Sequence, residues 1–70
     1  MRVRRSTDLG ALVAERREQR GLTQQQLADE SGVTRLWLNK FERGNPGAAM
    51  YRVFYVLEAL ELRMDIEDAR

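Results

Sequence analysis

The chain has 70 residues, a formal net charge of +1, and neither cysteine nor histidine. These counts exclude disulfides and thiolate or imidazole metal sites, and they leave little for acid–base or nucleophilic chemistry, so we expect neither an enzyme nor a cofactor. A domain of this size buries only about 60% of its unfolded-chain surface, so we expect a second subunit to supplement the fold.

Charge is distributed unevenly along the sequence. Residues 1–57 carry ten basic and six acidic side chains (+4), whereas residues 58–70 carry two basic and five acidic ones (−3). A basic body favours an anionic partner, although ordinary solvated surface charge explains the same balance. No apolar run approaches the ~20 residues of a membrane span and no signal peptide is visible, so we expect a cytoplasmic protein without membrane contact.

Residues 1–6, MRVRRS, predict a flexible basic arm. Its three arginines, Arg2, Arg4 and Arg5, could enter a minor groove of DNA, but we favour a solvated arm without contacts. A first helix is predicted from Thr7, with Ser6 or Thr7 as its cap, and it should end at Gly21. Apolar residues recur in it at helical spacing: Leu9, Leu12 and Val13.

Two short helices follow in close succession. Thr23 and Gln26 have the spacing of a capping box, and the helix they begin should stop at Ser31-Gly32. Thr34 is the candidate cap of the next helix, which should end at Gly44. Two short helices joined by a tight glycine-containing turn are typical of a helix-turn-helix.

The helix after Thr34 has two distinct faces at ~100° per residue. Leu38 and Phe41 should face the core, while Trp37 lies on a flank and should pack as a partly buried edge. The alternative for Trp37 is a contact with DNA backbone or a partner protein. The outward side chains are mostly basic or amide: Arg35, Leu36, Asn39, Lys40 and Arg43. Such an exposed basic face after a tight turn suits the DNA major groove.

A fourth helix is predicted from Ala48 to Leu60, with Pro46 acceptable in its first turn. Its inward face should comprise Met50, Val53, Phe54, Leu57 and Leu60. Val56 widens that apolar face beyond what a small monomeric core needs, which suggests a second packing partner.

The last segment, residues 62–70, changes its period. Leu62, Met64 and Ile66 alternate with charged residues, which predicts a half-buried strand. Because one strand cannot satisfy its own backbone groups, we expect it to pair with the same strand of a second subunit in a two-fold dimer. A frayed helical extension with chance alternation is the alternative.

The run LTQQQLADESGVTRLWLNKFERG closely resembles the phage-repressor and Cro-like helix-turn-helix, the XRE family, and the match extends back to Arg17. The resemblance implies an all-α, lambda-repressor-like DNA-binding domain of four to five short helices over residues 7–61. It implies that Arg35, Leu36 and Lys40 face bases. It also implies an ion pair between Arg17 and Glu42, for which two unrelated surface charges are the alternative.

Other residues of the motif are expected to position the DNA. Gln24 resembles the residue that contacts phosphate and braces the recognition helix, and the hydroxyl or backbone N–H groups of Thr23 and Thr34 suit phosphate as well. We expect Arg43 to contact phosphate. Asn39 could bond an adenine edge, a phosphate or only water.

Leu36 departs from the polar residue usual at its position. It could touch a thymine methyl group, or it could cover a neighbouring side chain.

The ending EALELRMDI resembles that of HipB-type antitoxins. This resemblance implies a dimeric repressor of a palindromic operator that also holds a HipA-like kinase toxin inactive, with no small-molecule ligand. A stand-alone XRE-family or phage-type regulator is the alternative, and a protein-interaction module that has lost DNA binding is a third reading.

Overall fold

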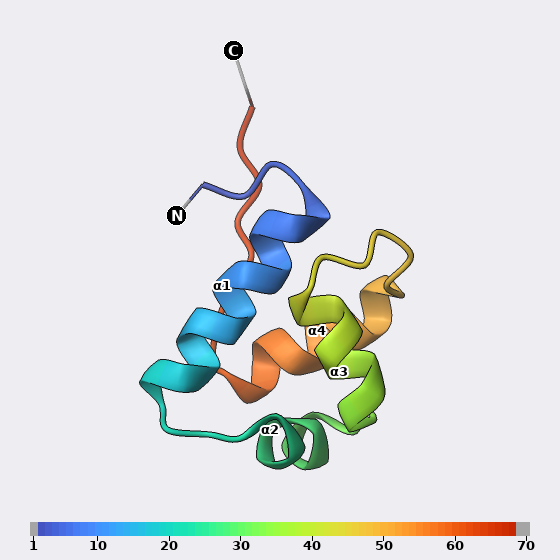
Figure 1. Cartoon of the computed structure of the whole chain (residues 1–70). Coiled ribbons are helices and arrows are strands. Elements are labelled where there is room, and N and C mark those ends of the chain that lie inside the picture. The colour runs from blue at the N-terminus through green and yellow to red at the C-terminus, as the bar shows by residue number, and fades with distance from the viewer. Residues whose placement is uncertain (1, 69–70) are drawn as a thin grey trace.

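The computed structural model describes residues 2–68 as four helices packed around one core (Figure 1). These are α1 (Ser6–Gln19), α2 (Gln24–Ser31), α3 (Arg35–Glu42) and α4 (Met50–Ala59). The all-α prediction is therefore confirmed, with four helices. In this part of the chain, no helix is long and apolar enough to cross a membrane.

The turn between α2 and α3 follows from local sequence. The Thr23 hydroxyl accepts a hydrogen bond from the Gln26 N–H, and the Gln26 side chain accepts one from the Thr23 N–H, so the predicted capping box is confirmed. Gly32 ends α2 with a positive φ of 77°, which a residue with a Cβ adopts only at a cost. The Thr34 hydroxyl then caps α3 by accepting from the Trp37 N–H.

The start of α1 differs from its prediction. Neither Ser6 nor Thr7 is the cap; the capping position is Arg5, and its side chain makes no cap hydrogen bond. Instead the Asp8 carboxylate accepts the backbone N–H groups of Arg4 and Arg5. An acidic side chain in the first turn thus satisfies amides that precede the helix, and the arm is one residue shorter than expected.

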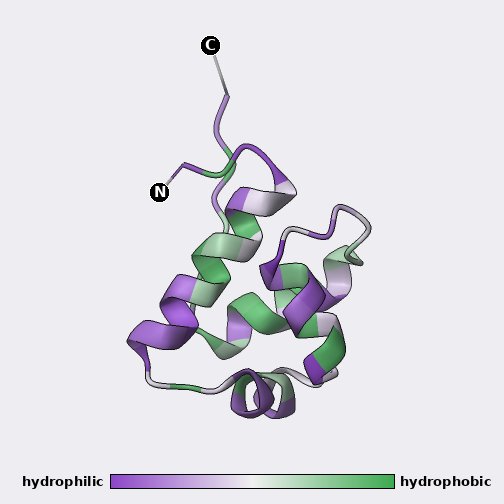
Figure 2. Cartoon of the chain, in the orientation of Figure 1, coloured by the Kyte–Doolittle hydropathy of each residue, from purple (hydrophilic) through white to green (hydrophobic). Residues whose placement is uncertain are grey.

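The core lies where the four helices meet, and Phe41 is its largest fully buried side chain. One polar residue, Ser31, is also buried, and its hydroxyl donates to the Leu27 carbonyl. The buried apolar residues are Val13, Leu27, Ala28, Leu38, Phe41, Val53, Val56, Leu57 and Leu60. Helices α1 and α3 approach closely at Gly10, where a Cβ would overlap the carbonyl oxygen of Phe41. Figure 2 shows that α4 is the most uniformly hydrophobic helix and that α2 is largely polar outside the core.

Helix α4 begins later and faces inward differently than predicted. It starts at Met50 rather than Ala48, and Pro46 lies in the preceding turn, where the Asn45 side chain accepts the Gly47 N–H. Its buried positions include Val56, whereas Met50 and Phe54, both predicted to face inward, are each 50% exposed. Two neighbouring stripes of α4 are apolar, so periodicity alone did not decide which one meets the core.

The predicted strand is not formed within the described chain. Residues 62–68 follow Glu61 as an irregular segment, and most of their side chains are exposed. Leu62 is the exception, since it packs against the core. A lone segment has no backbone partner that would define a strand, so the alternating pattern remains a prediction about an assembly rather than about this chain alone.

Candidate nucleic-acid interface

Helix α3 presents a basic surface that the rest of the described chain leaves open. Three of its side chains and that of the residue just after it are exposed: Arg35, Leu36, Lys40 and Arg43. Leu36 is 64% exposed, which is high for a large apolar residue on a packed helix. We call these four residues with Asn39 the recognition surface. Leu36 therefore does not serve as cover for a neighbouring side chain.

Trp37 belongs to the packing side of α3. Its ring stacks on Phe41 with centroids 5.1 Å apart and an interplanar angle of 19°. It is partly buried and packs against the core beside Val33. The flank position predicted from the helical wheel is correct. The burial of Leu38 and Phe41 in the core sets the rotation of α3, so its basic residues point outward.

An ion pair ties α1 to the end of α3. The Arg17 Nε donates to Glu42 Oε2 at 2.8 Å, and a second guanidinium nitrogen donates to Glu42 Oε1 at 3.0 Å. The side chains are 13% and 6% exposed, respectively. Arg17 also donates to the Leu22 carbonyl at 2.9 Å, which anchors the loop before α2. The hydrogen bond to Glu42 raises the pKa of Arg17, so the guanidinium group stays protonated throughout the neutral range.

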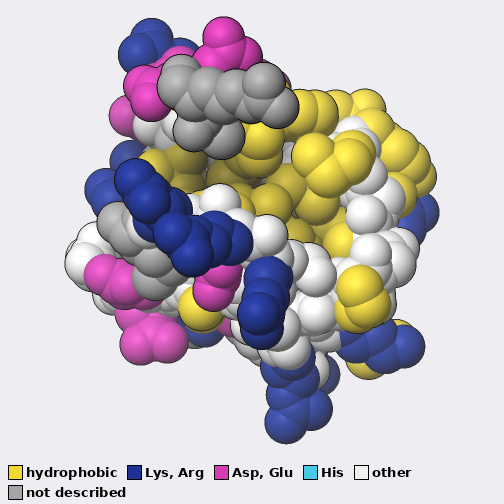
Figure 3. Space-filling view, turned by 90° about the horizontal axis from the view of Figure 1, so that it is seen from above, with side chains coloured by type: hydrophobic (Ala, Val, Ile, Leu, Met, Phe, Trp, Pro, Cys, Tyr) yellow, Lys and Arg dark blue, Asp and Glu magenta, His cyan; other side chains and the backbone are white. Residues whose placement is uncertain are grey.

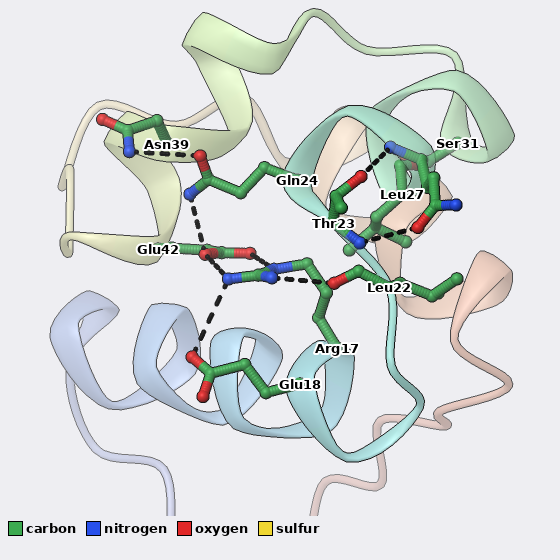
Figure 4. Close-up of polar contacts among 10 residues, drawn as sticks. Arg17, Glu18, Leu22, Thr23, Gln24, Leu27, Ser31, Asn39 and Glu42 are labelled. Atoms are coloured by element: carbon green, nitrogen blue, oxygen red, sulfur yellow. Dashed lines mark hydrogen bonds and ion pairs between the residues drawn. The ribbon is translucent and has the colours of Figure 1, made fainter.

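Gln24 connects this pair to the recognition surface (Figure 4). Its Nε2 donates to Glu42 Oε1 at 3.0 Å, while its Oε1 accepts from Asn39 Nδ2 at 3.4 Å. Helix α2 thereby braces α3 through side chains as well as through the shared core. The structure brings together four residues to which the sequence had assigned three separate roles: Arg17 and Glu42 as an ion pair, Gln24 and Asn39.

The two threonines are partly committed to structure. Each hydroxyl oxygen accepts a capping bond, Thr23 at the start of α2 and Thr34 at the start of α3. Both residues are exposed, and each retains a hydroxyl hydrogen that can be donated outward.

Beyond the far end of α3, Lys40 and Arg43 border a shallow surface hollow with Asn45 and Pro46. A basic hollow at this place suits a phosphate group.

The remaining predicted residues lie apart from α3 in the fold. Arg2, Arg4 and Arg5 are exposed ahead of α1, near the segment that contains Met64 and Ile66.

Sequence reasoning missed that Asn39 is half-buried and bonded to Gln24. The family resemblance indicated that Gln24 braces the recognition helix, but it did not name Asn39 as the partner, because that contact depends on how α2 crosses α3.

Comparisons with known proteins agree with this geometry. Residues 8–62 match the model of a family described as a helix-turn-helix domain. An uncharacterised HTH-type transcriptional regulator, y4mF, of Sinorhizobium fredii is 35% identical over 65 residues, covering 93% of this chain and 86% of the relative. The solved HipB-O4 20mer complex contains a chain that is 28% identical, with a TM-score of 0.90 and coverage of 100% of this chain and 99% of that one. A chain of the HipA-HipB-O2-O3 complex is 30% identical, with a TM-score of 0.88 and the same coverage.

Proposed function

This chain belongs to the helix-turn-helix family of DNA-binding regulators, with a HipB-type fold, and from that premise we propose that it is a sequence-specific repressor that binds a palindromic operator as a dimer. The observation that carries the proposal is the recognition surface itself. Its basic side chains are exposed, while the helix beneath them is held by Phe41 and by the Arg17–Glu42 pair. A rigid helix with a solvent-exposed basic face has the properties required to recognise base edges in the DNA major groove.

Each residue of the surface receives a role in this proposal. Arg35, Leu36, Asn39 and Lys40 read bases. The side chains that position the phosphate backbone are Thr23, Gln24, Thr34 and Arg43. The arginines of the N-terminal arm, Arg2, Arg4 and Arg5, remain candidates for a minor-groove contact, which the exposed position of the arm permits.

Dimerisation is supported by a second exposed surface. Four large apolar side chains of α4 are each at least half exposed: Met50, Tyr51, Phe54 and Tyr55. We call them the apolar face. Figure 3 shows a broad apolar area on one face of the molecule, bordered by Lys and Arg side chains. Such a patch on a small domain marks an interaction site. A second copy that covers it would also supply a partner for residues 62–68.

A HipA-like toxin is the proposed protein partner. The support is the 30% identity and full-length overlap with a chain of the HipA-HipB-O2-O3 complex. The overlap extends through the C-terminal segment, where the sequence resembles HipB-type antitoxins. The second candidate is a stand-alone regulator, which the HTH-type transcriptional regulator y4mF favours. Co-purification with the product of an adjacent kinase-like gene decides between them, and the absence of such a gene favours the stand-alone regulator.

A mobility-shift assay against DNA upstream of the protein's own gene tests the central proposal. We expect binding to weaken steeply with salt, because neutralised phosphates release counterions. Arg35→Ala and Lys40→Ala should each reduce affinity for the specific site by roughly tenfold relative to non-specific DNA. If both variants bind as the wild type does, the assignment of the recognition surface is wrong.

The dimer has a separate test in a truncated chain. Removing residues 62–70 should yield a monomer in sedimentation experiments, because the proposed strand pair is lost. The operator of a two-fold dimer should contain half-sites about one helical turn, or ~10 bp, apart. A truncated chain that remains dimeric contradicts the strand pairing while leaving the apolar face as the interface.

A further inference from the structure

A chain of hydrogen bonds runs from the interior of the domain to the recognition surface. Arg17 donates to both carboxylate oxygens of Glu42, at 2.8 and 3.0 Å. Gln24 Nε2 donates to Glu42 Oε1 at 3.0 Å, and Asn39 Nδ2 donates to Gln24 Oε1 at 3.4 Å. Figure 4 shows the four side chains in sequence, with the carbonyl oxygen of Asn39 directed away from Gln24.

The direction of these bonds is fixed by the chemistry of the inner end. A guanidinium group only donates, and an ionised carboxylate only accepts. Gln24 must therefore turn its NH2 group toward Glu42, which leaves its carbonyl oxygen for Asn39. Asn39 can meet that oxygen only with its own NH2 group. Although amide orientations are normally assigned rather than observed, here each one follows from its neighbour.

Resting on the proposed DNA-binding function, we infer that the Arg17–Glu42 pair determines, through Gln24, which edge of the Asn39 amide faces the DNA. Asn39 then selects a base that carries an exocyclic amino group, adenine in preference to cytosine. Arg17 and Gln24 are positioning residues in this arrangement, and Asn39 is the reading residue. The positions of the hydrogen-bond donor and acceptor of the Asn39 amide on the recognition surface are therefore fixed by residues beneath it.

The choice of base follows from what Asn39 has left to offer. One N–H is bonded to Gln24, so the carbonyl oxygen and one N–H remain available. Adenine presents an amino donor beside the N7 acceptor in the major groove, which matches both groups. Cytosine presents the amino donor alone. Guanine and thymine present keto oxygens, which would face the Asn39 carbonyl oxygen without a hydrogen between them.

Selection from a pool of DNA with randomised half-sites tests the reading role. Wild-type protein and the Asn39→Ala variant are compared, and the variant removes no core contact. We expect one position in each half-site to require adenine, on the order of tenfold over guanine, in the wild type only. Selection of guanine or thymine at every position that Asn39→Ala affects overturns the inference, as does a variant with an unchanged site. Failure of the wild type to select any site would instead contradict the proposed function.

A variant of Gln24 tests whether the orientation of Asn39 depends on the inner end of this chain of hydrogen bonds. Gln24→Met keeps the shape of the side chain but has no amide group, so it cannot fix the orientation of the Asn39 amide. Its overall affinity should fall because Gln24 is also a proposed phosphate contact, so the readout is the adenine-to-guanine ratio. We expect that ratio to approach one while the preferences at other positions remain. An unchanged ratio overturns the inference.

Discussion

The recognition surface and the apolar face differ in how far contacts within one chain pair their polar groups or bury their apolar side chains. Beneath the recognition surface, the polar groups of Arg17, Gln24 and Glu42 are paired with one another, and no side-chain nitrogen or oxygen buried within residues 2–68 lacks a partner. The apolar face leaves four large side chains at least half exposed to water. The polar groups beneath the recognition surface need no partner from another molecule, whereas the side chains of the apolar face are buried only if another molecule covers them.

The difference teaches where each kind of partner can bind. A reading surface must keep its shape before DNA arrives, since flexible side chains pay an ordering cost on binding. Breaking the first region should therefore reduce the stability of the fold, whereas breaking the second should change the assembly.

Breaking the Arg17–Glu42 pair should have the largest effect. Arg17→Ala leaves the Glu42 carboxylate, 6% exposed, without its counter-charge, and should lower the free energy of unfolding by about 3 kcal/mol. Urea denaturation at a fixed protein concentration measures the loss. Glu18→Ala is the control, because its contact with Arg17 is 3.8 Å long and its side chain is 71% exposed, so the change should stay within about 0.5 kcal/mol. Equal losses in both variants would mean that the pair has no special role.

Disrupting the apolar face should change the assembly rather than the fold. Phe54→Glu places a charge in the proposed interface, and we expect the dimer to dissociate about 100-fold more readily, because a buried unpaired charge is costly. Sedimentation equilibrium measures this change. Leu36→Glu is a matched control, since Leu36 is also exposed and apolar but lies on the recognition surface. If both variants remain dimeric, the apolar face is not the interface between subunits.

The same contrast explains what the sequence could predict. Helix ends were predictable where a signal is local: the capping hydroxyls of Thr23 and Thr34 and the glycine at position 32 act on their own backbone. The start of α1 was mispredicted because Asp8 reaches backward to the amides of Arg4 and Arg5. Ser6 and Thr7 offered equally good capping groups, and composition does not rank them.

Features that depend on packing between elements were harder to predict. The Arg17–Glu42 contact came from the family resemblance, since 25 residues separate the two in sequence. The bond between Gln24 and Asn39 requires the crossing of α2 and α3, which no spacing reveals. On α4 two adjacent stripes are apolar, so the inward position of Val56 and the outward position of Phe54 follow from the core and not from period.

Removing a helix cap should have a smaller effect that sharpens the comparison. Thr34→Ala deletes the acceptor for the Trp37 N–H and should destabilise the domain by about 1 kcal/mol. Because α3 carries the recognition surface, fraying at its start should also weaken DNA binding without changing the dimer. Thr34→Ser restores the hydroxyl oxygen and should recover most of the loss, as measured by thermal unfolding and mobility shift. A serine variant as unstable as the alanine variant would place the effect in the lost methyl group instead.

The smallest expected effect concerns a single phosphate. Arg43 is exposed beside the hollow at the end of α3, so Arg43→Ala should leave the free energy of unfolding nearly unchanged. If Arg43 neutralises one phosphate in each half-site, a dimer loses two such contacts, and the slope of log affinity against log salt should become shallower by about two. Arg63→Ala is the matched control, because Arg63 lies in the C-terminal segment with a side chain that is 87% exposed. Arg43 and Arg63 carry the same charge, and only Arg43 is expected to contact a phosphate directly. An equal change of slope in both variants would therefore indicate that the overall electrostatic potential of the protein, and not a local contact, sets the salt dependence.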